Sequence, residues 1–171
     1  MTTVAAIRAP SIEETLGKEA LRKVMAIRKA AKQLDDVDVI DTTVQKTYRW
    51  IDEISEELGI VGRREAYRDL RAFLQTVRDR LTVDLAADLG AQLPMLVRGI
   101  YYEAWDPSRA PVKMRAEEFV EVFIARAVLP PDREPLAALK AAARVLRRHV
   151  SEGETENVLL SLPSEIRVLL E

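Results

Sequence analysis

Apolar residues recur three and four positions apart along most of the chain, which is the period of an α-helix. No segment alternates cleanly with the period of a strand. Glycine and proline interrupt the pattern only at intervals, which is typical of helices joined by short connections. The pattern predicts an all-α fold. Over the first part of the chain it predicts helices at residues 11–34, 43–58, 63–80, 82–93 and 94–103.

Individual residues set several of the expected helix ends. Gly59 follows the second predicted helix, where a residue that tolerates a left-handed backbone commonly ends a helix. Pro94 disfavours helical geometry in the residue before it and suits the first turn of the next helix. The acidic stretch DDVDVIDTT, residues 35–43, is expected to be a link in which Asp41 or Thr42 caps the second helix.

The second half of the sequence repeats the plan of the first half at an offset of 69 residues. Residues 50–101 align with residues 119–170 without a gap, and eight of the 52 pairs are identical. Thr82 corresponds to Ser151 at an expected N-cap, where Ser151 and Glu154 also match a capping box. We therefore predict two tandem four-helix repeats packed as one helical domain, because neither copy can bury its apolar face alone.

This plan divides the chain into four segments. An extra amphipathic helix precedes the repeats, and a linker rich in proline and polar residues joins them. The segments are the N-terminal helix, the first repeat, the linker and the second repeat, at residues 1–36, 37–106, 107–116 and 117–171. The apolar stripe of the N-terminal helix consists of Leu16, Ala20, Val24, Ile27, Ala31 and Leu34.

Composition narrows the classes of function. The chain has no cysteine, which excludes disulfides and thiolate metal sites. Its net charge of −2 gives no general attraction to nucleic acid or to anionic membranes. We expect no signal peptide, because residues 1–10 contain one Arg and no apolar core of sufficient length. We expect no membrane span, because no later apolar run approaches about 18 residues. A cytoplasmic protein is the expectation.

Several segments resemble a known family. The runs VQKTYRWIDEISEELGI, QLPMLVRGIYYEAW and LPSEIRVLL are similar to a bacterial family described only as domain of unknown function 2267. The similarity covers residues 37–170, so the N-terminal helix lies outside it. The resemblance implies an all-helical, internally repeated bacterial protein, and it implies no activity.

No arrangement typical of an active site stands out in the sequence. His149 is the only histidine, and its counterpart in the first repeat is Arg80, so we expect a basic surface position. No serine is placed as a nucleophile that such a histidine would activate. Pairs of acids four residues apart lack the histidines of di-metal bundles. We therefore predict no catalytic residue, no metal site and no cofactor.

Charged residues are distributed unevenly. Residues 1–34 carry seven Lys or Arg against three Glu, and residues 35–57 carry eight acids against two bases. This polarity suits packing of one segment on the other, within a chain or between subunits. Basic side chains also follow one face of the helix at residues 63–80 and of its counterpart, interleaved with acids in the first copy. They are Arg64, Arg68 and Arg71, then Lys140, Arg144, Arg147 and Arg148.

The segment AQLPMLVRGIYYEAWDP, residues 91–107, gathers unusual side chains. Its helical spacing predicts one buried face, and the features that have no counterpart in the second repeat form a candidate patch for a partner or ligand. A glycine within a helix also suggests close approach of another backbone. The buried face consists of Leu93, Leu96, Val97, Ile100 and Tyr101, and the candidate patch of Arg98, Gly99, Tyr102 and Trp105.

Two internal ion pairs are also predicted from residues shared by both copies. Glu65 corresponds to Glu134, and Arg98 corresponds to Arg167. The same pair, Glu65 with Arg98 and Glu134 with Arg167, is therefore expected twice.

These observations predict a non-catalytic helical module for interaction or assembly, acting as a homo-oligomer or with a protein partner. Two alternatives stay open. The first is a nucleic-acid-binding regulator that uses the basic helix at residues 63–80. The second is a protein that binds a small molecule or anion in a pocket between the repeats, with Arg98 as an anion anchor beside Tyr102 and Trp105.

Overall fold

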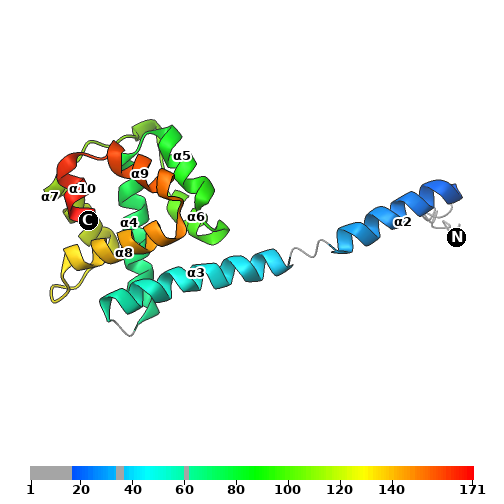
Figure 1. Cartoon of the computed structure of the whole chain (residues 1–171), viewed down its shortest axis with the longest axis horizontal. Coiled ribbons are helices and arrows are strands. Elements are labelled where there is room, and N and C mark those ends of the chain that lie inside the picture. The colour runs from blue at the N-terminus through cyan, green and yellow to red at the C-terminus, as the bar shows by residue number, and fades with distance from the viewer. Residues whose placement is uncertain (1–16, 34–36, 60–61) are drawn as a thin grey trace, which may run out of the picture. The chain divides into compact units, whose positions relative to one another are not determined.

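A computed structural model of the chain describes residues 17–33, 37–59 and 62–171 (Figure 1). Within these ranges it has nine α-helices, one short 3-10 helix and no strand, which confirms the predicted all-α fold. The elements are α2 (Lys18–Gln33), α3 (Val37–Leu58), α4 (Arg63–Arg80), α5 (Val83–Gln92), α6 (Met95–Tyr102), η1 (Pro107–Arg109), α7 (Ala116–Ala127), α8 (Pro135–His149), α9 (Glu152–Ser161) and α10 (Ser164–Leu170).

The chain divides into two units, residues 1–41 and residues 42–171. The first contains α2 and the start of α3. The second, called the body below, contains the rest of α3 and all later helices. None of the described helices is long and apolar enough to cross a membrane.

Helix α4 is the central element of the body. It packs against α6, α7 and α8, and Figure 1 shows it running between them. Phe73 and Leu74 of α4 are buried together with Trp50 of α3 and Phe119 and Phe123 of α7. Burial of each such side chain contributes about 1.5–3 kcal/mol, so the core is large enough to hold short helices in place.

Several predicted helix ends agree with the structure. Helix α4 begins and ends at the predicted residues, and Gly59 follows α3 with a φ of +61°. Thr82 caps α5, since its Oγ1 accepts a hydrogen bond from the backbone N–H of Leu85 at 3.4 Å. Pro94 is the N-cap of α6 rather than its first helical residue.

The prediction of an acidic link at residues 35–43 is wrong from residue 37 onward, where the chain is helical. Helix α3 begins at Val37, so Asp38 and Asp41 lie within its first turns. No helix begins at residue 43, and the predicted cap by Asp41 or Thr42 is therefore also wrong. Acids near a helix N-terminus are stabilised by the helix dipole, which makes this stretch suitable for a helix start. In the N-terminal segment, α2 covers residues 18–33 of the predicted helix, and residues 1–16 lie outside the described residues.

The capping box predicted at the start of α9 is not formed. The side chain of Ser151 makes no capping hydrogen bond, and Oε1 of Glu154 is buried without a hydrogen-bond partner. Burial, and next the negative charge of Asp88, raise the pKa of the Glu154 carboxyl. Glu154 therefore lies toward α5, which packs against α9, instead of turning back to the helix start.

Candidate functional site

The predicted buried face of α6 is present in part. Leu93, Val97 and Tyr101 are buried, but Leu96 is 42% exposed. The prediction that Leu96 belongs to the core is therefore wrong. Helix α6 has only eight residues and packs against α4 and α5. A buried face narrower than the predicted one is therefore enough to hold it against the body.

Arg98 closes the end of α5. Its Nε donates to the carbonyl of Gly90 at 2.7 Å, and its Nη2 donates to the carbonyls of Ala91 and Leu93 at 3.1 Å each. The last carbonyls of a helix lack partners within the helix and carry the negative end of its dipole, so a guanidinium stabilises them. Arg98 thus has a structural role within its own chain.

The structure does not bring together either of the predicted ion pairs. Glu65 lies against Gly62 at the start of α4, and Glu134 accepts a hydrogen bond from the backbone N–H of Leu136 at the start of α8. Nε of Arg167 is buried without a hydrogen-bond partner. Glu65 and Glu134 stand at helix N-termini and Arg98 at the end of α5. Glu134 and Arg98 bind backbone groups nearby instead of the predicted partners.

The close approach expected at Gly99 occurs at another glycine. A Cβ at Gly99 would meet no atom within 4 Å, whereas a Cβ at Gly90 would stand 2.1 Å from Oη of Tyr102. The Tyr102 ring lies across α5 and its Oη donates to the carbonyl of Ala86 at 3.3 Å. Gly90 is therefore the position at which the backbone makes room for a neighbouring side chain.

The two glycines allow a matched test. Gly90→Ala is expected to lower the free energy of unfolding by about 1–3 kcal/mol, because the Tyr102 ring must leave its place. Gly99→Ala is expected to raise it by about 0.5–1 kcal/mol, because alanine favours an exposed helix position. Urea denaturation of both variants measures this difference. Equal effects of the two substitutions would contradict the assignment.

Tyr102 and Trp105 form one stack. Their ring centroids are 5.4 Å apart with an interplanar angle of 27°, and both side chains are half-buried against the core. Of the predicted patch, only Arg98 and Gly99 are exposed, and Arg98 is held by α5. The structure therefore brings Tyr102 and Trp105 together and leaves them a limited outward surface.

Sequence reasoning missed the buried cation beneath this stack. The side chain of Arg78 is 4% exposed, and its guanidinium carbon lies 5.8 Å from the ring centroid of Trp105. Arg78 donates to the carbonyls of Tyr101 and Glu103 and to the carboxylate of Asp79. The only signal in the sequence was its identity with Arg147 in the repeat alignment.

A pocket of about 270 Å³ lies beside Trp105. Arg78, Asp79 and Arg126 are among its lining residues. Asp79 forms an ion pair with each arginine. Its Oδ1 lies 2.8 Å from Nη2 of Arg78, and its Oδ2 lies 2.6 Å from Nη2 of Arg126. These charged groups satisfy one another, so they are occupied in holding α4 to α7.

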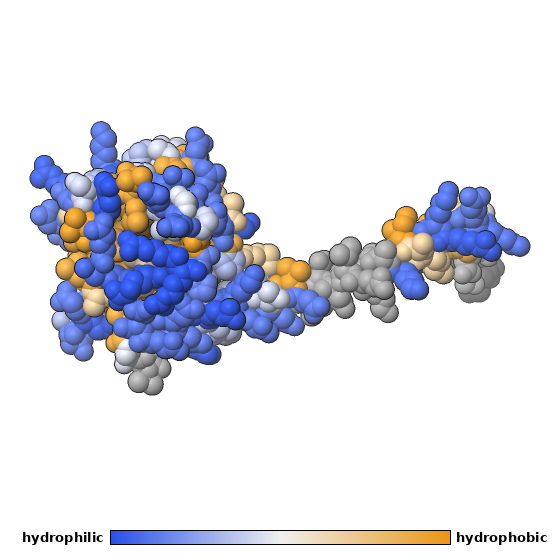
Figure 2. Space-filling model, in the orientation of Figure 1, coloured by the Kyte–Doolittle hydropathy of each residue, from blue (hydrophilic) through white to orange (hydrophobic). Residues whose placement is uncertain are grey.

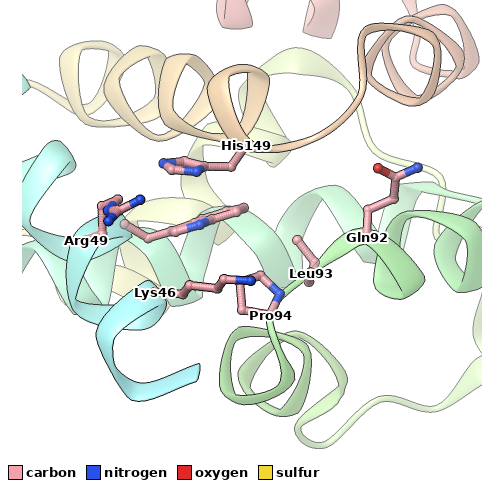
Figure 3. Close-up of a pocket in the computed structure, with 7 residues that line it drawn as sticks. Lys46, Arg49, Gln92, Leu93, Pro94 and His149 are labelled. Carbon is pink, nitrogen blue, oxygen red and sulfur yellow. The ribbon is translucent and has the colours of Figure 1, made fainter. Parts of the chain in front are cut away.

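A second pocket of about 270 Å³ lies between α3, the turn from α5 to α6 and the end of α8 (Figure 3). Lys46, Arg49 and Trp50 line it from α3, Gln92 from α5 and His149 from α8. His149 is half-buried, not at the surface as its sequence context suggested. We call this the His149 pocket.

Two contacts fix the His149 ring at the edge of this pocket. The ring stacks on Trp50 with centroids 4.9 Å apart and an interplanar angle of 23°. Its Nε2 lies 2.9 Å from Oε1 of Glu53. The imidazole is thus a wall of the pocket, held from α3.

One family model matches most of the body. It is described as uncharacterized conserved protein (DUF2267), and it matches residues 47–169 of the 171-residue chain. The chain belongs to this family. The DUF2267 match contains α4 to α9 and most of α10, whereas α2 and the start of α3 lie outside it. A search of curated proteins finds no match to the chain.

Three of the seven basic side chains predicted on the two helix faces of this DUF2267 protein form ion pairs. Arg144 binds Glu57 at 2.8 Å, Arg148 binds both Glu57 and Glu53, and Arg71 binds Glu103 at 2.8 Å. The hydrogen bond from Arg148 is the main cause that lowers the pKa of the Glu57 carboxyl. These arginines join α8 to α3 and α4 to the end of α6, which reduces the positive charge available to a polyanion.

The same body shows no centre for metal chemistry. Among the residues that the structure describes, no three His, Asp or Glu side chains converge on a point that could hold a metal ion. Two features that suit binding are the exposed apolar side chains Met25 and Ile27 of α2 and the His149 pocket.

Proposed function

We propose that this DUF2267 protein is a non-catalytic interaction module that self-associates through α2 and the first turns of α3. The observation that carries the proposal is the exposure of apolar side chains on α2. Ile27 of the predicted stripe is 67% exposed and Met25, outside the stripe, is 51% exposed. Figure 2 shows hydrophobic surface on this helix. A single helix cannot bury its own stripe, and isolated helices of about 15 residues are marginal in water. Helix α2 therefore needs a partner surface.

Charge favours the first turns of α3 as that surface. Helix α2 carries six Lys or Arg against one Glu. At the start of α3, Asp38 and Asp41 are exposed, and the apolar side chains of Val39 and Ile40 are 57% and 50% exposed. The two segments thus offer opposite charges around apolar residues, which suits specific pairing.

The partner that we propose is a second copy of the chain. A hairpin folded back at residue 35 would place Leu21 opposite Arg49 and Val24 opposite Lys46, so apolar side chains of α2 would meet charged ones. Pairing between two copies allows another register. A twofold dimer would also form each contact twice, which doubles its contribution to affinity.

We also propose that the body is a tandem duplication, with α3–α6 and α7–α10 as the two copies. Helices α5 and α9 span residues 83–92 and 152–161, and both bounds differ by 69. Helices α6 and α10 begin at residues 95 and 164, again 69 apart. These spacings equal the offset of the sequence alignment.

A reversed ion pair supports the duplication further. Asp79 of α4 binds Arg126 of α7 at 2.6 Å. Shifting these two positions by 69 residues in opposite directions gives Arg148 of α8 and Glu57 of α3, which also form an ion pair. The same contact recurs with its charges exchanged, as expected if the first helix of each copy packs on the second helix of the other.

Deletion of residues 1–36 tests self-association. We expect the full-length chain to give a mass in light scattering of at least twice 19.3 kDa, and the shortened chain to give the mass of a single chain. Ile27→Asp, which places a charge in the stripe twice per dimer, is expected to weaken association at least 100-fold.

Val168→Asp is the control, because Val168 is 64% exposed on the body. It should leave the mass unchanged. A single-chain mass for the full-length protein would contradict the proposal, as would an unchanged mass after the deletion.

A nucleic-acid-binding regulator is the less supported alternative. Its basic faces would need several unneutralised cations, and three of the seven cations there, Arg71, Arg144 and Arg148, are paired with acids. Self-association therefore accounts better for the surfaces of this chain.

A further inference from the structure

The His149 pocket contains two cations that the rest of the body does not neutralise. In residues 37–59 and 62–171, neither Lys46 nor Arg49 has an ion-pair partner, and both side chains are exposed. They come from one side of α3 and line the same pocket (Figure 3). In the pocket beside Trp105, by contrast, Arg78 and Arg126 share one carboxylate.

An acid in contact with the pocket residue His149 is already balanced by arginines. Glu53 contacts His149 at 2.9 Å and Arg148 at 3.5 Å, on the α8 side. Arg144 and Arg148 together balance Glu53 and Glu57, so the charge of Glu53 does not cancel the charges of Lys46 and Arg49. The pocket has a net positive charge.

A further polar group is available opposite these cations. Oε1 of Gln92 accepts a hydrogen bond from the backbone N–H of Ser151 at 3.3 Å, which leaves the amide N–H groups of Gln92 as donors. Lys46 and Arg49 thus supply cationic donors on one side of the pocket, and Gln92 lies on the other side, where Figure 3 draws its amide nitrogen pointing away from these cations. This donor-rich lining suits an anion with several oxygen acceptors.

We propose that the His149 pocket binds a small dianion, a phosphate monoester or a dicarboxylate, through Lys46 and Arg49. Two charges on the ligand match the two unpaired cations. A pocket of about 270 Å³ lies near the lower end of the range for small-molecule sites, so it accommodates a small metabolite and not a large cofactor.

The corresponding place in the second half of the body is not such a site. A shift of 69 residues replaces Arg49 by Glu118, whose Oε2 accepts a hydrogen bond from the backbone N–H of Arg115 at 2.9 Å. It replaces His149 by Arg80, whose Nη1 donates to the carbonyl of Val112 in the linker at 2.5 Å. Lys46 corresponds to Arg115, which is exposed and has no ion-pair partner among the described residues. The second half therefore keeps one cation at this place, beside an acid and a linker contact, whereas the first half has two.

The two tryptophans allow a direct test on the full-length chain. Trp50 lines the His149 pocket and Trp105 lines the other pocket, so each indole N–H signal in an NMR titration reports on one pocket. We would titrate glycerol 3-phosphate, malonate and acetate at constant ionic strength. The Trp50 signal is expected to shift and saturate with at least one dianion, whereas the Trp105 signal stays in place.

Two charge-neutralising variants test whether Lys46 and Arg49 bind the dianion, and a third variant serves as a control. Lys46→Gln and Arg49→Gln should each weaken dianion binding about tenfold or more, because each removes a charged hydrogen bond. Lys113→Gln removes the same charge from an exposed position outside the pocket and should change binding less than about twofold. Comparison of glycerol 3-phosphate with malonate identifies the ligand class.

Three results would overturn the proposal. The first is a Trp50 signal that does not move at about 20 mM dianion, which is about twenty times a dissociation constant of 1 mM. The second is equal weakening by Lys113→Gln, since that would indicate a diffuse charge effect. The third is equally strong binding of acetate, a monoanion. Loss of self-association in the α2 variants would leave this test unaffected, because Lys46 and Arg49 belong to the body.

Discussion

Replacement of Arg78 by methionine is expected to lower the free energy of unfolding by about 3–5 kcal/mol, because it breaks a buried charge network. The guanidinium is almost fully buried and binds the carbonyls of Tyr101 and Glu103 at the end of α6. Methionine fills much of the volume but cannot donate, so these carbonyls lose their partner. Asp79 keeps only Arg126.

Arg147→Met is the matched control for this prediction. Arg147 is the residue that aligns with Arg78 at the offset of 69, but it is half-buried and has no ion-pair partner among the described residues. Its replacement should change stability by less than about 0.5 kcal/mol. Urea denaturation followed by circular dichroism measures both variants. Similar losses in the two would show that the carbonyl contacts of Arg78 contribute little.

Replacement of Arg133 by methionine is the second substitution with a large expected effect. Nη2 of Arg133 lies 2.5 Å from Oδ2 of Asp69, whose side chain is 0% exposed, and the pair joins α4 to the loop before α8. Without Arg133, Asp69 must stay charged in the core or bind a proton. We expect a loss of about 3–5 kcal/mol at pH 7.

The loss should depend on pH in a defined direction. Burial is the main cause that raises the pKa of the Asp69 carboxyl, and Arg133 opposes it. Removal of Arg133 therefore raises this pKa further. A carboxyl whose pKa is raised by folding stabilises the protein below its unfolded pKa of about 4, and that stability is lost as the pH rises through the folded value. Arg133→Met should thus be closer to wild type at pH 4 than at pH 7.

Two further variants complete this experiment. Asp69→Asn combined with Arg133→Met should recover part of the loss at pH 7 and remove the extra pH dependence, since no charge remains to be buried. Arg64→Met, at the exposed position that aligns with Arg133, should have an effect below about 0.5 kcal/mol. An Arg133→Met loss that is the same at pH 4 and pH 7 would contradict the role given to Asp69.

Local rules explain why much of the fold was predictable. The bounds of α4 and the Thr82 cap of α5 depend on side chains within a few residues of the helix ends, which a linear pattern records. The acidic stretch before residue 43 was misassigned because an exposed helix face and a polar link have similar composition. Only the continuing helical backbone of α3 distinguishes them.

The candidate patch was harder to predict because its residues find partners outside their own helix. The spacing of Arg98 and Tyr102 is compatible with a shared surface, but each side chain instead reaches a carbonyl of α5. Helical periodicity places residues on a face of one helix. It does not say which neighbouring helix covers that face.

The sequence by itself determined that the chain is helical, where α4, α5 and α6 begin and end to within one residue, and which family it belongs to. These properties follow from short-range patterns and from similarity along the chain. The tertiary structure alone decided that Arg78 is buried, that Arg133 meets Asp69, and that Arg49 and His149 line one pocket. These side chains contact residues far away in the sequence, and their burial and charge balance arise only when the helices pack together.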